Sequence, residues 1–206
     1  MNKFKVISFY TPGSYEQMAN DILLPSLQRL ELEFECKKVE DQGSWLANIA
    51  HKPTIILNAL IENKPKNIVY LDTDAVVQCY PKLFDSIPEE CDIAFHVLDH
   101  NVWYRTNTNK KEVFNGTIFF RNNDNVLKFV TEWRKKCFSL DTGEHIWFER
   151  LVNSTNLKCY YLPIEYSYIF SLPDGKEPYI KVENPVIIHY QASRRFKRKQ
   201  TAKNRL

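Results

Sequence analysis

Apolar residues occur along the chain in two patterns, short runs that are mostly apolar and longer stretches with helical spacing. The runs at 4–10, 67–71 and 113–121 are rich in β-branched and aromatic residues, which is typical of buried strands. Further apolar or alternating runs predict strands at 32–39, at 92–97, near 157–161 and at 185–190. Helical spacing predicts helices over 15–30, from Gly43–Ser44 to about residue 61, over 124–138 and over 143–153.

Strands and helices alternate through the first half of the chain, which is typical of a βαβ sheet with mostly parallel strands. We therefore expect an α/β fold in which helices flank a mixed, mostly parallel sheet. No repeat or linker divides residues 1–193, so they are expected to form a single domain. Ser14 is expected to cap the first helix, and Pro53 is expected to break the second.

The length and composition limit the classes of protein to which the chain can belong. With 206 residues it has the size of one domain, and 44% hydrophobic and 26% charged residues exclude a disordered or fibrous chain. No apolar stretch approaches the roughly 20 residues of a membrane helix, and the first ten residues are expected to form a strand, not a signal peptide. We therefore expect a cytoplasmic protein without a transmembrane segment.

The five cysteines are odd in number and show no C-x-x-C spacing. They therefore predict neither a disulfide framework nor a zinc site, and a reducing compartment is expected. Because each lies beside apolar sequence, we expect all of them to be small core residues. They are Cys36, Cys79, Cys91, Cys137 and Cys159.

The C-terminal segment 194–206 has a charge unlike that of the rest of the chain. It holds seven Lys or Arg residues and no acid, so the formal charge of +3 becomes −4 for residues 1–193 alone. Three interpretations remain open for this basic tail. It is a solvated terminus, a contact for nucleic-acid phosphates, or a segment that binds an anionic membrane surface. The oligomeric state is left open.

Two aspartates directly follow the strand predicted at 67–71, where the carboxyl ends of parallel strands bind ligands. At Asp72 and Asp74 in extended backbone, both side chains would point the same way. Neighbouring carboxylates repel one another, and a hard cation such as Mg²⁺ or Mn²⁺ relieves this repulsion while binding substrate phosphates. The alternative is a turn in which one aspartate caps the backbone and the other is solvated.

Several motifs, in order along the chain, resemble GT-A fold glycosyltransferases of the glycogenin and galactosyltransferase-like group. NIVYLDTDAVVQ resembles their D-x-D segment, and KVISFYTPGSY resembles their first strand with its nucleoside-binding loop. FNGTIFFRNN, Trp133 and NPVIIHYQ resemble a later strand, a helix and the strand that supplies the third metal ligand. The resemblance implies a Rossmann-like GT-A domain over 1–193 and a nucleotide-diphospho-sugar transferase of a small phage or bacterial type.

The resemblance also implies roles for individual residues. The metal ligands are Asp72, Asp74 and His189. The nucleotide-sugar donor is bound by Thr11, Tyr15, Lys52, Asp72, Gly116 and, just beyond the metal histidine, Arg194 and Lys197. The residues implied to act at the reacting sugar are Asn115, Asp141 and Glu144.

One segment departs from the family pattern. The group has an Asp-Gln pair where this chain reads Asp141-Thr142-Gly143-Glu144-His145, so either Asp141 or Glu144 takes the acidic role and His145 stands where Gln is usual. The resemblance favours a retaining reaction. An inverting enzyme would need a carboxylate base near the acceptor hydroxyl, for which Asp99, Asp141 and Glu144 are the candidates.

The expected activity is therefore a metal-dependent hexosyl or pentosyl transfer from a nucleotide-sugar, with UDP-sugar as the favoured donor and Mn²⁺ or Mg²⁺ as cofactor. The acceptor is a hydroxymethylated pyrimidine in DNA that contacts the basic tail, or a cell-surface glycan or lipid-linked acceptor reached by peripheral membrane contact. A nucleotidyltransferase is disfavoured, because TPGSYEQ has one glycine and no following arginine. A non-catalytic nucleic-acid-binding module would not need the two aspartates and the histidine.

The polar stretch 99–112 is expected to be a loop that acts as a lid.

Overall fold

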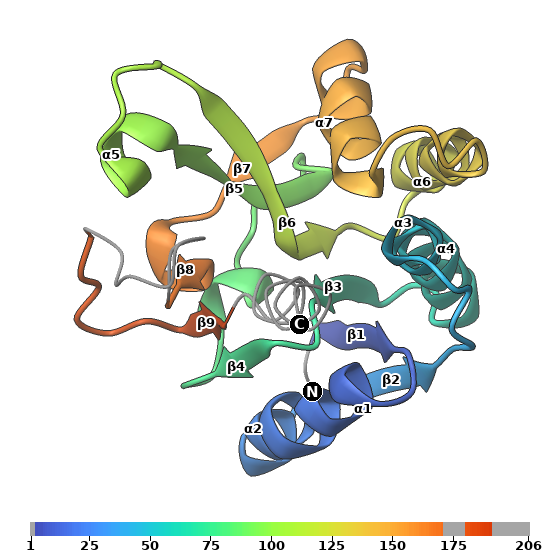
Figure 1. Ribbon diagram of the computed structural model, residues 1–206, viewed down its shortest axis with the longest axis horizontal. Helices are drawn as coiled ribbons and strands as arrows, with labels where there is room; N and C mark the ends of the chain where they lie inside the picture. Colours follow the sequence, from blue (N-terminus) through green and yellow to red (C-terminus); the bar gives the residue numbers. More distant parts are fainter. Residues whose placement is uncertain (1–2, 171–179, 191–206) are drawn as a thin grey trace, which may run out of the picture.

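The computed structural model describes residues 3–170 and 180–190. Its main feature is a six-stranded sheet in the order β2-β1-β3-β6-β5-β7 (Figure 1). The strands are β1 (Phe4–Tyr10), β2 (Phe34–Lys38), β3 (Asn67–Leu71), β5 (Ile93–Asp99), β6 (Lys111–Phe120) and β7 (Cys159–Tyr161).

Five of these strands run in one direction, and only β6 runs against them. The predicted mostly parallel α/β sheet is therefore confirmed. The carboxyl ends of β1, β2, β3, β5 and β7 consequently meet at one edge, and β6 begins at that edge. Loops that follow the parallel strands are thereby brought together, as ligand sites of such sheets require.

A second, three-stranded sheet lies beside the first and has the order β4-β9-β8. Its strands are β4 (Ala75–Val77), β9 (Ile187–His189) and β8 (Tyr168–Ile169). Because β4 follows β3 after only three residues, this small sheet is attached directly to the end of the central strand. The strand predicted at 185–190 is therefore present but shorter, and β8 was not predicted because a two-residue strand carries no periodic pattern.

Helices cover both faces of the main sheet (Figure 1). On one face, Ile56 and Leu60 of α4, Trp133 of α6 and Phe148 of α7 are fully buried in one core cluster. On the other face, Leu23 and Leu27 belong to a second cluster. The helices are α1 (Ser14–Met18), a π-helical turn η1 (Ala19–Leu23), α2 (Leu24–Arg29), α3 (Trp45–Ile49), α4 (Lys52–Glu62), α5 (His100–Tyr104), α6 (Asp124–Cys137) and α7 (Glu144–Ser154), with 3-10 turns η2 (Lys82–Asp85) and η3 (Ile164–Tyr166).

Two helix starts differ in how well they follow the sequence prediction. The predicted break near Pro53 is confirmed, because α3 ends at Ile49 and α4 begins at Lys52 with the proline in its first turn. The predicted cap at Ser14 is wrong, since Gly13 with a φ of 88° holds the cap position and Ser14 is the first helical residue. Gly13 can adopt this left-handed backbone without the steric penalty of a side chain.

The stretch 99–112 is not the unstructured loop that its polarity predicted. It contains α5, and β6 already begins at Lys111. The Asp99 side chain accepts a hydrogen bond from the Asn101 backbone N–H and so caps the helix. Trp103 is buried, with its ring centroid 6.2 Å from that of Tyr168. A buried aromatic anchor, which polarity alone did not reveal, therefore orders this segment.

The expectation that all cysteines are core residues is wrong. All five are free thiols, but only Cys137 is buried, while Cys79 is exposed and the other three are partly buried. Cys79 and Cys91 lie in loops between helices and strands, where an apolar neighbour in the sequence does not fix the burial of a side chain.

In the part of the chain that the structure describes, no helix combines the length and apolar character needed to cross a membrane.

Candidate metal and donor site

The two aspartates lie in the turn that connects β3 to β4. β3 ends at Leu71, the Asp72 backbone N–H donates to the Gly116 carbonyl at 2.9 Å, and the Ala75 N–H donates to the Asp72 carbonyl at 3.0 Å. The prediction that the two aspartates lie in extended backbone is therefore wrong, because they lie in a turn. The turn, tied to β6, fixes both aspartates at the edge of the sheet.

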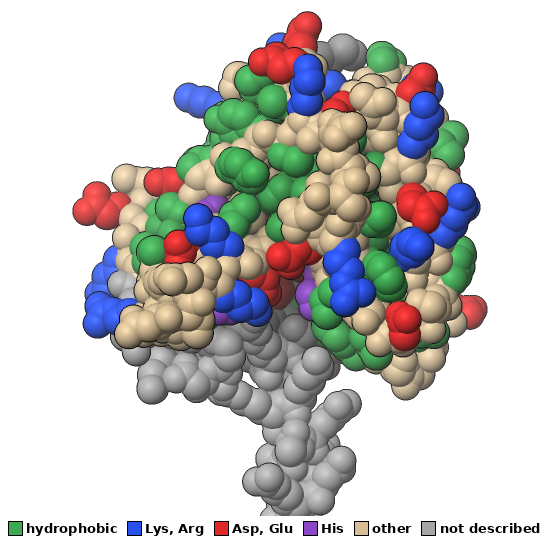
Figure 2. All heavy atoms as spheres, turned by 90° about the horizontal axis from the view of Figure 1, so that it is seen from above, with side chains coloured by type: hydrophobic (Ala, Val, Ile, Leu, Met, Phe, Trp, Pro, Cys, Tyr) green, Lys and Arg blue, Asp and Glu red, His purple; other side chains and the backbone are tan. Residues whose placement is uncertain are grey.

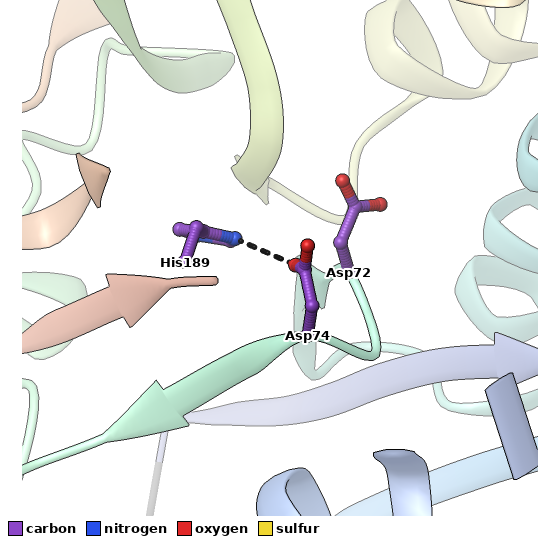
Figure 3. A group of neighbouring side chains, drawn as sticks. All are labelled: Asp72, Asp74 and His189. Atoms are coloured by element: carbon purple, nitrogen blue, oxygen red, sulfur yellow. Dashed lines mark hydrogen bonds and ion pairs between the residues drawn. The ribbon is translucent and has the colours of Figure 1, made fainter. Parts of the chain in front are cut away.

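His189 is brought to this turn by the small second sheet. β9 pairs antiparallel with β4, with Ala75 opposite His189, and the Tyr190 N–H donates to the Asp74 carbonyl at 3.1 Å. The buried His189 ring then places Nδ1 3.4 Å from Asp74 Oδ1 (Figure 3). Two residues separated by more than a hundred positions are in this way held side by side.

The three side chains fit a divalent metal ion. Asp72, Asp74 and His189 each offer one ligand atom, and these atoms all lie within 4.8 Å of one another. Ligands about 2.1 Å from a single ion lie at most roughly 4.2 Å apart, so a closure of a few tenths of an ångström would suffice. Two carboxylates and an imidazole are donors suited to Mn²⁺ and also acceptable to Mg²⁺. Figure 2 shows acidic side chains gathered in a hollow of the surface, with histidine and basic side chains nearby.

A bulge in β6 delivers further residues to the same edge. The pairing of β5 with β6 shifts between Phe95 and His96, where Phe95 is opposite Ile118 but His96 is opposite Phe114. The three intervening residues 115–117 therefore have no partner on β5. Bulges are common beside active sites because they redirect side chains. Here the bulge presents Asn115, Gly116 and Thr117 to the aspartate turn and to His189.

Lys52 lies beneath the aspartate turn and connects it to α7. Its Nζ is 3.1 Å from Asp72 Oδ1, 3.0 Å from Glu144 Oε1 and 3.3 Å from the Asn115 carbonyl, and only 3% of the residue is exposed. Burial acts to lower the pKa of Lys52, but the carboxylates of Asp72 and Glu144 outweigh it and raise this pKa above its ordinary value. The lysine therefore stays charged and holds the two acids together.

Of the two acids that the sequence left open, Glu144 joins the site and Asp141 does not. Glu144 is buried at the start of α7, and Asn115 Nδ2 donates to its two oxygens at 3.0 and 2.8 Å. Burial raises the pKa of Glu144, and Lys52 and Asn115 offset part of that effect. Asp141 is exposed and accepts a hydrogen bond from Ser139 at 2.7 Å. The His145 ring lies 6.4 Å from the ring of Trp45.

The end of β1 contributes the residues predicted for the nucleoside. Thr11 is buried just beyond the strand, and Tyr15 lies in the first turn of α1. Burial, followed by the charges of Asp74 and Asp72, raises the pKa of Tyr15 to about 12. The charges of both acids therefore act on the Tyr15 hydroxyl. Arg194, Lys197 and the basic tail 194–206 lie outside the described residues.

The sequence analysis did not identify two polar residues of the site, Tyr70 and Thr117. The Tyr70 hydroxyl donates to Asp72 Oδ1 at 2.9 Å, and Lys52 Nζ lies 4.7 Å from the centre of the Tyr70 ring. Thr117 Oγ1 lies 2.8 Å from Nε2 of His189. The signal was present in both cases, since each is a polar side chain within an otherwise apolar strand.

Replacement of Gly116 by alanine is expected to disturb His189 in the candidate metal site. An added Cβ would lie 2.7 Å from Phe114 Cζ and 3.0 Å from His189 Cε1, so at least one ring must move. We expect a loss of about 1–3 kcal/mol in the free energy of unfolding, as for other overpacked sites, and weaker Mn²⁺ binding. Denaturant unfolding and Mn²⁺ titration measure the two effects.

The matched control for Gly116→Ala is Gly143→Ala, whose Cβ would meet the His145 ring instead of His189. We expect this control to retain the Mn²⁺ affinity of the wild type. Equal Mn²⁺ affinity in Gly116→Ala and the wild type would contradict the assigned crowding at His189.

The comparison with protein families agrees with this geometry. A family model described as nucleotide-diphospho-sugar transferase matches residues 41–201, so the chain belongs to that family. With the fold, this defines a glycosyltransferase of the GT-A kind that uses a nucleotide-sugar. No curated protein matches the chain in a search by sequence.

Solved glycosyltransferase structures share the fold at low sequence identity. An enzyme involved in the glycosylation of the major capsid of PBCV-1 is 13% identical with a TM-score of 0.66, over 96% of this chain and 98% of that chain. Mouse xyloside xylosyltransferase 1 is 12% identical with a TM-score of 0.56, over 92% and 98%. The galactosyltransferase LgtC, solved with donor and acceptor sugar analogs, is 9% identical with a TM-score of 0.52, over 91% and 87%.

Proposed function

We propose that the protein transfers a sugar from a nucleotide-diphosphate-sugar, with UDP-sugar as the donor class, to an acceptor hydroxyl with the help of Mn²⁺ or Mg²⁺. The observation that carries this proposal is the convergence of Asp72, Asp74 and His189 at the carboxyl edge of the sheet. Membership in the nucleotide-diphospho-sugar transferase family supports the donor class. A divalent ion held there would neutralise the charge of the departing diphosphate.

The described residues around the metal ligands support distinct tasks in donor binding. Thr11, just beyond β1, and Tyr15, in α1, are the proposed contacts of the nucleoside. Asn115 and Gly116, on the bulge of β6, are the proposed contacts of the sugar, where Gly116 would allow close approach of the backbone. Glu144 orients Asn115 through two hydrogen bonds. Arg194 and Lys197 are retained as proposed diphosphate contacts on the strength of the sequence alone.

Retention of configuration is the proposed stereochemical course. The three carboxylates that could serve an inverting reaction are all engaged elsewhere. Asp99 caps α5, Asp141 is exposed and bonded to Ser139, and Glu144 is held by Lys52 and Asn115. These contacts support retention, because inversion needs a strong general base at the acceptor hydroxyl.

Two acceptor classes follow from different observations. The basic tail supports DNA that carries hydroxymethylated pyrimidines, an acceptor that would require the predicted cytoplasmic location and would fit a phage enzyme. The structural neighbours support a glycan, because one is named as a xyloside xylosyltransferase and another was solved with an acceptor sugar analog. A lipid-linked glycan, reached by peripheral membrane contact through the tail, belongs to this second class.

A donor and acceptor screen tests the proposal. We expect Mn²⁺-dependent release of a nucleoside diphosphate from at least one nucleotide-sugar, and none after chelation with EDTA. Addition of modified DNA, free glycans or lipid-linked glycans in separate arms is expected to accelerate the release for one class only. Failure of every nucleotide-sugar to turn over in any arm would overturn the proposed activity.

A further inference from the structure

Tyr70 lies near the end of β3, two residues before Asp72, and is only 2% exposed. Its hydroxyl donates to Asp72 Oδ1 at 2.9 Å. We propose that Tyr70 is a positioning residue that, together with Lys52, holds Oδ1 of Asp72 so that only Oδ2 can bind the metal ion, which favours Mn²⁺ or Mg²⁺ over Ca²⁺. This inference rests on the metal site of the proposed function and adds the selectivity of that site among divalent ions.

Two donors contact the same oxygen of Asp72. Lys52 Nζ lies 3.1 Å from Oδ1, which also accepts the bond from Tyr70, whereas Oδ2 accepts no hydrogen bond from the residues that the structure describes. A carboxylate can only accept hydrogen bonds, so the hydroxyl is the donor, and each carboxylate oxygen offers about two lone-pair positions. The two donors therefore occupy Oδ1, and Oδ2 remains for an ion.

Both donors are buried and held in place, whereas the carboxylate that they contact is not buried. Lys52 is also fixed by Glu144 Oε1 at 3.0 Å and by the Asn115 carbonyl at 3.3 Å. The Tyr70 ring lies with its centre 4.7 Å from Lys52 Nζ. The side chain of Asp72 is 38% exposed, so nothing in its own packing would prevent the carboxylate from rotating. The two buried donors therefore set the direction of this carboxylate.

A carboxylate that offers a single oxygen does not suit all divalent ions equally. Mg²⁺ requires a near-octahedral set of about six ligands, and Mn²⁺ is commonly octahedral as well. Ca²⁺ takes about six to eight oxygen ligands and often binds a carboxylate through both of its oxygens. With Oδ1 occupied, Asp72 supplies one ligand where Ca²⁺ would gain from two. The arrangement therefore favours the smaller ions.

Tyr70→Phe tests the inference, because phenylalanine keeps the ring and removes only the hydroxyl. Oδ1 of Asp72 then regains a lone-pair position, so the carboxylate can rotate and offer both oxygens. We expect Mn²⁺ affinity in the presence of UDP, measured by electron paramagnetic resonance of free Mn²⁺, to fall about 10-fold, as for other residues that orient metal ligands. Ca²⁺ affinity, measured by displacement of Mn²⁺, should stay the same or rise, so the preference for Mn²⁺ should fall at least about 10-fold.

Tyr80→Phe is the matched control. The Tyr80 hydroxyl donates to Asp85 Oδ2 at 2.6 Å, and Asp85 belongs to η2, outside the metal site. Both variants lose one bond between a tyrosine hydroxyl and a carboxylate, so denaturant unfolding should show similar, small losses of stability. The control should keep the wild-type affinities for both ions.

The preference between the two ions separates positioning from a merely structural role. An unchanged preference for Mn²⁺ over Ca²⁺ in Tyr70→Phe, including an equal loss of both affinities, would overturn the role of Tyr70 alone. A wild type that binds Ca²⁺ as tightly as Mn²⁺ would do the same. A wild type that binds neither ion, even with UDP, would overturn the proposed metal site together with this inference.

Discussion

Asp74→Asn is expected to abolish the joint stabilisation of the protein by Mn²⁺ and UDP. A diphosphate and two aspartates are all anionic, so neither ligand should bind well without the cation that bridges them. In the wild type, a ligand at about 100 times its dissociation constant stabilises the native state by about 2.7 kcal/mol. For a chain of this size, that corresponds to a rise of roughly 5–10 °C in melting temperature.

The asparagine keeps the shape of the side chain and removes its charge, so the native fold should persist. We expect the melting temperature of this variant to be the same with both ligands as with either alone. Turnover should fall at least about 100-fold, as when one electrostatic contact to a developing charge is lost. Thermal unfolding with Mn²⁺, with UDP and with both measures the first effect, and release of the nucleoside diphosphate measures the second.

Asp124→Asn is the matched control, because its carboxylate is 85% exposed at the start of α6 and far in sequence from the turn. This control should respond to the two ligands like the wild type. Full joint stabilisation in Asp74→Asn would show that Asp74 does not bind the metal ion.

Lys52→Met is expected to cause the largest loss of stability among substitutions near the site. Lys52 is buried and forms ion pairs with both Asp72 and Glu144. Its removal leaves the buried Glu144 without its cation and two negative charges facing each other. Breaking a buried ion pair in this way costs about 3–5 kcal/mol in the free energy of unfolding. Urea unfolding of the metal-free protein measures the loss.

Two further variants separate charge from packing. Lys135→Met removes a lysine that is 63% exposed and pairs with Glu132 at 3.5 Å, and its effect should stay below about 0.5 kcal/mol. The double variant Lys52→Met with Glu144→Gln should recover part of the stability that Lys52→Met loses, because no uncompensated carboxylate then remains on α7. A Lys52→Met protein within 1 kcal/mol of the wild type would mean that the ion pairs do not hold the site together.

The sequence predicted elements well where a strand is buried on both faces. β1 and β3 are rich in apolar and β-branched residues, and their bounds agree with the prediction. Asp72 and Asp74 were proposed as metal ligands from their spacing after a strand, whereas His189 was proposed only through the resemblance to a family. Composition and spacing alone could not place His189 beside Asp74, because the pairing of β4 with β9 joins segments more than a hundred residues apart.

The features that were missed depend on register and burial. The bulge at residues 115–117 arises from a shift in pairing between β5 and β6, which no single strand encodes by itself. Asp141 and Glu144 differ in burial, which the sequence did not predict, since one carboxylate is exposed and the other contacts Lys52. Thr117 belongs to the same group, because its partner His189 lies on β9 of the second sheet, which does not pair with β6.

The position of β9 in the sequence limits when the candidate metal site can form during synthesis of the chain. All six strands of the main sheet lie before residue 162, whereas the imidazole ligand lies on the last described strand. The three side chains of the candidate metal site can therefore come together only after every strand of the main sheet has been synthesised, so the sheet alone does not contain the site.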